Sequence, residues 1–247
     1  MAEQLPIQFE YKIQQTFDNF FPGANQEVVT HLQNAIEQHQ EQFIFLWGSN
    51  GVGKTHLLNA CCQLAHESLL TTFSYSFTDH QLPTVRLLDG LESIDLVCFD
   101  NIDTLAGNAE WELALFNFFN RHRDQDRQLI VTSSTPPNYL TIELSDLKTR
   151  LNWGLTLKLE ALTDHDSLAA LNFRANLLGF RLSKEVGQYL ITRYARDLPS
   201  LWALLDSLDQ ASLAAKRKLT IPFLRQFLTS RAFESSESAV IQEPLNH

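Results

Sequence analysis

Eight consecutive residues of the sequence combine glycines with a lysine and a threonine in the pattern G-x-x-x-x-G-K-T; they are Gly48, Ser49, Asn50, Gly51, Val52, Gly53, Lys54 and Thr55. Glycine allows a tight turn, so that successive backbone N–H groups point inward and form a nest for phosphate oxygens. Lys54 would bring a positive charge to the β- and γ-phosphates of a nucleotide, and the Thr55 hydroxyl can ligate Mg²⁺. The pattern therefore predicts a nucleotide-phosphate site.

The residues on both sides of this loop support the same interpretation. The apolar run 43–47 before it is typical of a buried parallel strand, and residues 56–64, which begin with His56, are typical of an apolar helix. A glycine-rich turn that fits the pattern by chance is the alternative, expected in about one chain of this size in a hundred. Strand, loop and helix in this order favour a phosphate loop, with its phosphates at the start of the helix.

Two further strand ends carry polar residues that could act on a bound nucleotide. The apolar run 94–100 ends in Asp100, a place from which a carboxylate can reach Mg²⁺, although a strand that simply ends at a turn acid is the alternative. Asn101 follows where many ATPases carry a second acid, and an amide cannot accept a proton from water. We therefore expect slow intrinsic hydrolysis. Ser134, after the strand 128–132, could sense the γ-phosphate or could cap the next turn.

The order of elements predicts an α/β fold with a parallel five-stranded sheet in a three-layer sandwich, followed by a small all-α lid. Strands are expected at 43–47, 72–77, 94–100, 128–132 and 155–159, with helices between them. A short helix at 146–151 carries Lys148 and Arg150. We expect a flexible peptide at 1–15, the nucleotide-binding domain at 16–160, the helical lid at 161–231 and a disordered tail at 232–247. Asn25 is expected to cap the helix that precedes the first strand.

Two aromatic or apolar segments near the start of the chain each allow two interpretations. Residues 4–9 alternate apolar and polar side chains, and Leu5, Ile7 and Phe9 would share one side of an extended peptide. A frayed terminus explains the same pattern equally well. Phe20 belongs to an aromatic turn at 16–23, and its ring could pack on an adenine or in the core.

Composition excludes several classes of protein. The formal net charge of −10 argues against a nonspecific nucleic-acid binder. Three cysteines without metal-ligand spacing indicate reduced thiols. Neither a secretory signal nor an apolar run of about 18 residues is visible, so we expect a soluble cytoplasmic protein that contacts no membrane.

These features together resemble the AAA+ ATPases, and local strings resemble the DnaA branch: Thr16-Phe17-Asp18-Asn19-Phe20, Gly53-Lys54-Thr55-His56-Leu57-Leu58 and Arg150-Leu151-Asn152-Trp153-Gly154-Leu155-Thr156. The resemblance covers about residues 16–230. It implies an adenine nucleotide, ADP or ATP, with Mg²⁺ held at Thr55 and Asp100. It also implies that Arg150 acts as an arginine finger in trans; a surface ion pair with Glu143 or Asp146 is the alternative. Whereas DnaA continues into a helix-turn-helix domain, this sequence is expected to end after the lid.

A DnaA-like module with an N-terminal peptide of this kind is similar to the Hda family, the regulatory inactivators of DnaA. The resemblance implies that Gln4, Leu5, Ile7 and Phe9 bind the sliding clamp of DNA polymerase III and that the chain stimulates hydrolysis of DnaA-bound ATP. Contact with DNA would be indirect, and a homodimer or higher homo-oligomer is compatible with it. The lid arginine of the AAA+ ATPases, expected in the first turn of the third lid helix, falls on Pro199 here, and Arg196 is the nearest substitute. A helicase loader of the same branch and a small-molecule kinase are the alternatives.

Overall fold

The structure is a computed structural model, and it describes residues 15–78, 82–179, 182–193, 201–208 and 224. The chain divides into two compact units, Met1–Leu162 and Thr163–His247. In the described part of the chain, no helix combines the length and the apolar character that a membrane span requires.

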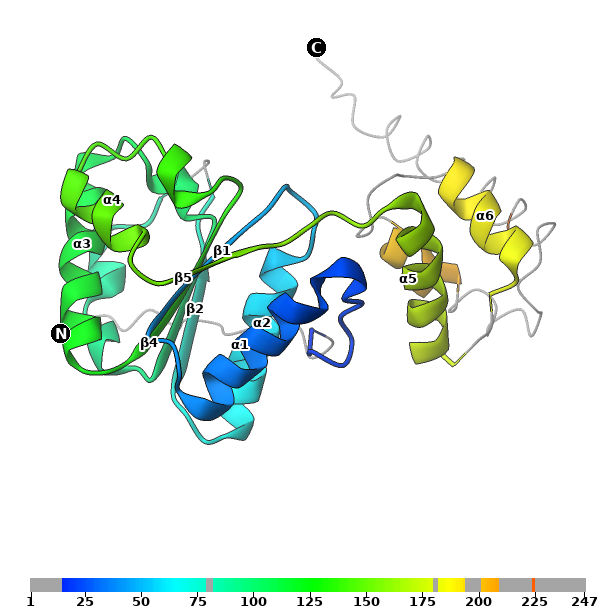
Figure 1. Cartoon of the computed structure of the whole chain (residues 1–247), viewed down its shortest axis with the longest axis horizontal. Helices are drawn as coiled ribbons and strands as arrows, with labels where there is room; N and C mark the ends of the chain where they lie inside the picture. Colours follow the sequence, from blue (N-terminus) through cyan, green and yellow to red (C-terminus); the bar gives the residue numbers. More distant parts are fainter. Residues whose placement is uncertain (1–14, 79–81, 180–181, 194–200, 209–223, 225–247) are drawn as a thin grey trace, which may run out of the picture. The chain divides into compact units, whose positions relative to one another are not determined.

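The first unit is built on a parallel sheet of five strands in the order β2-β3-β4-β1-β5 (Figure 1). The strands are β1 (Phe43–Trp47), β2 (Thr72–Ser76), β3 (Leu96–Asp100), β4 (Gln128–Ser133) and β5 (Leu155–Lys158). Strand β1 lies between β4 and β5, and β2 and β5 form the two edges. The predicted fold class, including the five parallel strands, is confirmed.

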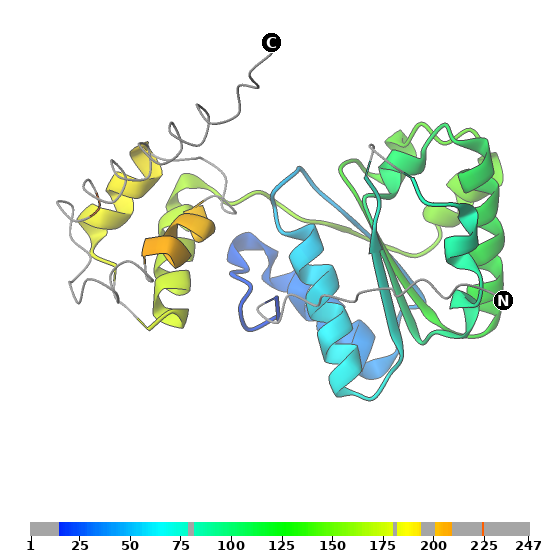
Figure 2. The same cartoon turned by 180° about the vertical axis from the view of Figure 1, so that it is seen from behind.

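Helices cover both faces of this sheet and complete the three layers (Figures 1 and 2). Helices α1 (Gln26–Gln38) and α2 (Lys54–Glu67) lie on one face, and α3 (Ala109–Asp124) and α4 (Ser145–Leu151) lie on the other. Because side chains alternate along a strand, Phe43 and Phe45 enter the core beneath α3, whereas Ile44 and Leu46 enter the core beneath α2. Short 3-10 turns connect the elements: η1 (Gly23–Asn25), η2 (Val85–Leu88), η3 (Leu91–Ser93), η4 (Ile102–Leu105) and η5 (Pro137–Tyr139).

The second unit is helical wherever the structure describes a regular element. It contains α5 (Asp164–Leu177), α6 (Lys184–Arg193) and a helical segment at 201–208. Thr163 and Asp166 form a capping box at the start of α5. Leu171, Leu190 and Leu205 are fully buried in a core of this unit's own, which fits the expected small all-α domain.

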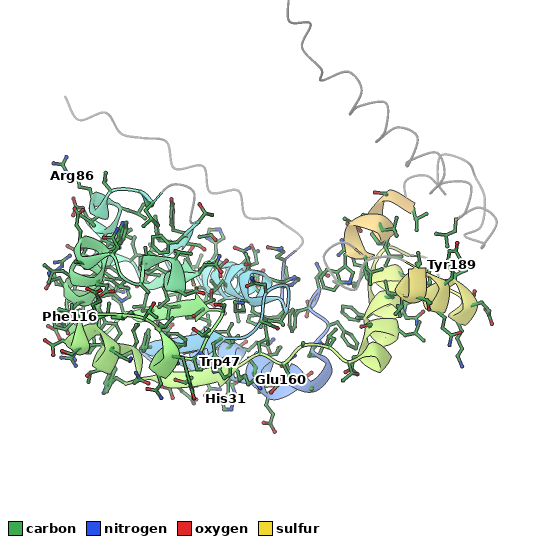
Figure 3. The ribbon with its side chains drawn as sticks, turned by 90° about the horizontal axis from the view of Figure 1, so that it is seen from above. His31, Trp47, Arg86, Phe116, Glu160 and Tyr189 are labelled. Atoms are coloured by element: carbon green, nitrogen blue, oxygen red, sulfur yellow. The ribbon has the colours of Figure 1, made fainter. Side chains whose placement is uncertain are left out.

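Asn25 precedes α1 as predicted, but its side chain does not cap that helix. The amide instead forms two hydrogen bonds with the backbone of Glu160, which follows β5 and is labelled in Figure 3. Asn25 Nδ2 donates to the Glu160 carbonyl at 3.0 Å, and the Glu160 N–H donates to Asn25 Oδ1 at 2.7 Å. Asn25 is therefore a buried link between the start of α1 and the end of the sheet.

Replacement of Asn25 by alanine is expected to lower the free energy of unfolding by about 1–3 kcal/mol. The reason is that the backbone N–H and C=O groups of Glu160 lose the side-chain amide that pairs with them. Urea denaturation of the purified variant measures this. Asn152→Ala is the matched control, since Asn152 is exposed and its side-chain amide donates to Lys148 O within its own turn; it should cost less than about 0.5 kcal/mol. Equal losses in the two variants would contradict the prediction.

His122 makes stability depend on pH. The ring is 1% exposed, lies 5.0 Å from the Phe118 ring, and places Nε2 3.2 Å from the Ile94 carbonyl. Burial lowers the pKa of His122 from 6.5 to about 4. In the unfolded chain His122 therefore becomes protonated below pH 6.5, whereas in the folded chain it stays neutral down to about pH 4. Stability present above pH 6.5 is lost as the pH falls through this window.

Between pH 7 and pH 5 the loss due to His122 is expected to be about 2 kcal/mol. Urea midpoints at the two pH values measure it, and His122→Gln should lose correspondingly less than the unmodified chain. His31→Gln, at an exposed position on α1 (Figure 3), is the control and should keep the full loss. An unchanged pH dependence in His122→Gln would show that other groups are responsible.

Candidate nucleotide-binding site

The glycine-rich loop lies where an open α/β sheet offers a ligand site. It joins the carboxyl end of β1 to α2, which begins at Lys54. The connection from β1 leads to β2 on one side of the sheet, whereas the connection from β4 leads past β1 to β5 on the other side. Ligands of open α/β sheets bind where the direction of the connections changes in this way. The loop therefore has the strand before it and the helix after it that the motif requires.

Two of the loop glycines are required by the backbone and by neighbouring atoms. A Cβ at Gly48 would lie 2.5 Å from the Leu159 carbonyl oxygen. Gly53 has φ of 105°, and a Cβ there would lie 2.7 Å from the Phe20 ring. A larger residue at either position would displace the loop.

Phe20 and His56 support this loop from the protein side. Phe20 is 6% exposed and belongs to the core beneath α2, with its ring 5.3 Å from the His56 ring. His56 Nε2 lies 2.8 Å from the Thr16 carbonyl oxygen. This burial favours the core interpretation of Phe20 over one in which it stacks on a base.

Lys54 places its ammonium group inside the loop. Its Nζ donates to the carbonyl oxygens of Gly48 at 2.7 Å and Ser49 at 3.1 Å, and the residue is 5% exposed. Burial lowers the pKa of Lys54, while the nearby charges of Asp100 and Asp103 act in the opposite direction. The ammonium group is thus already among the backbone groups that would surround a phosphate.

Asp100 gathers hydroxyl groups from three elements. It is 2% exposed, and its Oδ2 accepts hydrogen bonds from Thr55 Oγ1 at 2.6 Å and Ser76 Oγ at 3.3 Å. Its Oδ1 accepts from the hydroxyl of Thr132. The Thr55 hydroxyl and the Asp100 carboxylate are hard oxygen donors on adjoining elements, and this donor set fits Mg²⁺. The structure therefore brings together the two residues expected to hold the metal.

The side chain of Asn101 is directed towards the end of β2. The residue has a left-handed backbone (φ 59°, ψ 49°), and its Nδ2 donates to Ser76 Oγ at 3.3 Å, at the end of β2. Strands β3 and β4 separate β2 from β1, which carries the loop. Ser76 Oγ in turn donates to Asp100 Oδ2, so the Asn101 side chain is linked to Asp100 through Ser76.

Ser134 contacts a carboxylate that sequence reasoning missed. Its backbone N–H donates to Asp103 Oδ2 at 3.2 Å, and its hydroxyl donates to the same oxygen. Asp103 lies in η4, and its charge acts on Lys54. Ser76 and Thr132 were also missed, since a hydroxyl at a strand end is too common to be a signal. Asp103 could have been found from the sequence, because it is a second acid only three residues after Asp100.

The comparisons with known families decide where the chain belongs. Residues 11–158 match the family described as the bacterial DnaA ATPase domain, and residues 164–228 match the family described as Hda, lid domain. The chain belongs to the DnaA family of ATPase domains. Its second unit carries an Hda-type lid, so the resemblance seen in the sequence is confirmed.

Solved structures of DnaA have the same fold. Domain III of DnaA from Thermotoga maritima gives a TM-score of 0.72 at 20% identity, over 88% of this chain and 97% of that chain. A DnaA bound to AMPPCP and single-stranded DNA gives 0.69 at 20% identity, over 83% and 68%. AMPPCP-bound DnaA from Aquifex aeolicus gives 0.67 at 24% identity, over 76% of this chain and 63% of that one. At these identities the likeness concerns the fold alone.

Arg150 lies at the opposite end of the sheet of this DnaA-type domain. It is half-buried in the last turn of α4, and among the described residues it forms no ion pair. A Cβ at Gly154, four residues later, would lie 2.2 Å from the carbonyl oxygen of Phe43, the first residue of β1. The phosphate loop follows the last residue of β1, about 16 Å away at the usual rise of a strand. The structure therefore does not bring Arg150 to the chain's own loop.

The remaining predicted residues lie outside the described part of the chain. These are Gln4, Leu5, Ile7 and Phe9 of the terminal peptide, and Arg196 and Pro199 of the lid.

Lys54→Ala is expected to abolish nucleotide binding, because the loop loses its only ammonium group. A ligand that binds only the folded state stabilises it by about 2.7 kcal/mol at a hundredfold excess over Kd, and this gain should disappear in the variant. Thermal denaturation with and without ATP and Mg²⁺ measures it. Lys184→Ala, an exposed position in α6, should keep the full gain. A nucleotide-dependent gain that survives in Lys54→Ala would place the site elsewhere.

Proposed function

We propose that this chain is a regulator of bacterial replication initiation that holds an adenine nucleotide and stimulates hydrolysis of ATP bound to DnaA. The observation that carries the proposal is the position of Arg150, which lies beyond reach of its own phosphate loop and forms no ion pair with a described residue. Membership of the DnaA family and the Hda-type lid support this role. In this proposal the chain acts in the cytoplasm and contacts DNA only through its partners.

A bound nucleotide would be a structural part of this regulator. The loop from Gly48 to Thr55 would surround the phosphates, with Lys54 among their oxygens. Mg²⁺, ligated by Thr55 and Asp100, would offset part of the phosphate charge. DnaA structures that contain AMPPCP support a triphosphate analogue as a ligand of this fold, and ADP would use the same loop.

An arginine is chemically suited to act on a neighbouring molecule's nucleotide. Its guanidinium group is always charged and presents a planar fork of donors to phosphate oxygens. Beside it, Trp153 is 53% exposed, and the guanidinium group of Arg123 lies 5.8 Å from the centre of its ring. These residues give the end of α4 an exposed, cationic and aromatic surface. Such a surface fits contact with an anionic site on DnaA.

Replacement of Arg150 by alanine is expected to lower the stimulated rate of DnaA-bound ATP hydrolysis by a factor of about 10³–10⁵. This is the usual contribution of an arginine finger in trans. The assay measures ATP hydrolysis by DnaA in the presence of this protein and of clamp loaded on DNA. Folding, nucleotide retention and clamp binding should be unchanged, because in the proposal Arg150 contacts neither the phosphate loop nor the clamp-binding peptide.

Arg86→Ala is the matched control, because Arg86 is an exposed arginine of the same domain at η2 (Figure 3). It should leave the stimulation at the level of the unmodified protein. Stimulation by Arg150→Ala close to that level would refute the role of Arg150, and Lys148 in the same helix would then be tested.

We further propose that Gln4, Leu5, Ile7 and Phe9 bind the sliding clamp of DNA polymerase III as an extended peptide. The support is the alternation of apolar residues, which gives three anchors on one side. Each anchor can contribute roughly 1.5–3 kcal/mol on burial, and the ordering of the peptide opposes part of this. A peptide affinity in the micromolar range, on the order of 8 kcal/mol, is therefore expected.

The double variant Leu5→Ala, Phe9→Ala should weaken clamp binding at least tenfold, as measured by surface plasmon resonance with immobilised clamp. Glu3→Ala with Glu10→Ala, which leaves all three anchors in place, should bind within a factor of about three of the unmodified protein. If the anchor variant binds as well as this control, the peptide is not the clamp ligand.

A further inference from the structure

Two polar side chains that follow β3 lie on opposite sides of Asp100. Asn101 donates to Ser76 at the end of β2, whereas Asp103 accepts both hydrogen bonds from Ser134 at the end of β4. Strand β4 adjoins β1, the strand that enters the phosphate loop. The Gly48 N–H of that loop donates to the Ser133 carbonyl at 3.2 Å, so Asp103, bonded to the next residue, lies beside the phosphate loop, and its charge acts on Lys54.

One oxygen of Asp103 is open to a further hydrogen bond. Its Oδ1 is buried and has no hydrogen-bond partner among the described residues, whereas Oδ2 is occupied by Ser134. Both oxygens of Asp100 already accept hydrogen bonds from hydroxyl groups. A buried acceptor without a donor is costly, and such atoms in folded proteins commonly take a water or a ligand. Asp103 Oδ1 is thus the carboxylate oxygen of this site that can receive a new donor.

We propose that Asp103 is the catalytic base of this chain's own nucleotide site, in the place that the sequence suggested for residue 101. The inference rests on the proposed binding of ATP. A water held by Asp103 Oδ1 attacks the γ-phosphorus, the bond from that phosphorus to the β,γ-bridging oxygen breaks, and the water proton passes to Asp103. The products are ADP and inorganic phosphate, and the proton then returns to solvent.

The proposal also explains why this hydrolysis should be slow but measurable. General-base assistance contributes about 10²–10⁴ to a rate. The chain's own Arg150 is at the other end of the sheet and cannot add to it. We therefore expect a single-turnover rate of ATP hydrolysis below about one per second, and we expect this rate to depend on Asp103.

Asp103→Asn tests the proposal, because it keeps the size of the side chain and an acceptor for Ser134 but cannot take a proton. We expect single-turnover hydrolysis to fall at least tenfold. The Kd for AMPPCP, measured by calorimetry, should stay the same or become a few-fold tighter, because a negative charge beside the triphosphate is removed. A merely structural role would instead weaken AMPPCP binding together with the rate.

Controls separate this role from others. Asp95→Asn removes a carboxylate that accepts from Thr71 at the amino end of β3, and it should keep the hydrolysis rate. Asp103→Glu, which keeps the carboxylate, should retain more activity than Asp103→Asn and serves if the latter does not fold. In a Ser134→Ala background, Asp103→Asn should still lower the rate, because Asp103 acts on water and not only through Ser134.

Three results would overturn the proposal: an unchanged rate in Asp103→Asn, no effect of Asp103→Asn in the Ser134→Ala background, or bound ATP that the unmodified protein does not hydrolyse at all. Failure of the unmodified protein to bind AMPPCP is a different result, and it would refute the proposed nucleotide site itself.

Discussion

The buried carboxylate of Asp100 is the group on which the arrangement of the site depends. A charge with 2% exposure is costly unless it is compensated by hydrogen bonds. Here hydroxyl groups from β2, β4 and α2 supply those bonds, and the ammonium group of Lys54 adds an opposite charge. The same bonds hold the ends of three neighbouring elements at fixed positions. The phosphate loop, which precedes α2, therefore begins at strand ends that Asp100 holds together.

A second constraint is the separation of two chemical groups along β1. The phosphate loop follows Trp47, and the segment after Arg150 passes Phe43 at the other end of the strand. A strand is stiff and its length is set by its residues, so the two groups cannot meet within one chain. The phosphate loop and Arg150 therefore belong to two separate ends of the domain.

Much of the fold could be predicted because it depends on periodic burial and on a loop with unusual backbone demands. Phe43 and Phe45 alternate with Ile44 and Leu46 between two cores, and such alternation is visible in the sequence. The pair Thr55 and Asp100 could be predicted as well, since both follow from strand ends in a parallel sheet.

The details that could not be predicted depend on turns whose geometry sequence patterns do not encode. The left-handed backbone of Asn101 sends its side chain to Ser76 and leaves Asp103 beside Ser134. Asn25 has the right type and place for a helix cap, but a partner distant in sequence takes its amide. In each case tertiary contacts, which no local pattern records, decide where a polar side chain points.

The amide of Asn25 also has a consequence for the edge of the sheet. Strand β5 is an edge strand, and exposed N–H and C=O groups on such a strand invite pairing with other chains. Leu159 N–H turns inward to the Trp47 carbonyl, so the next residue, Glu160, presents its backbone groups outward. Asn25 meets both of them with a side-chain amide that imitates one peptide group of a neighbouring strand. With the charged side chain of Lys158 alongside, this edge is closed to intermolecular strand addition where β5 ends.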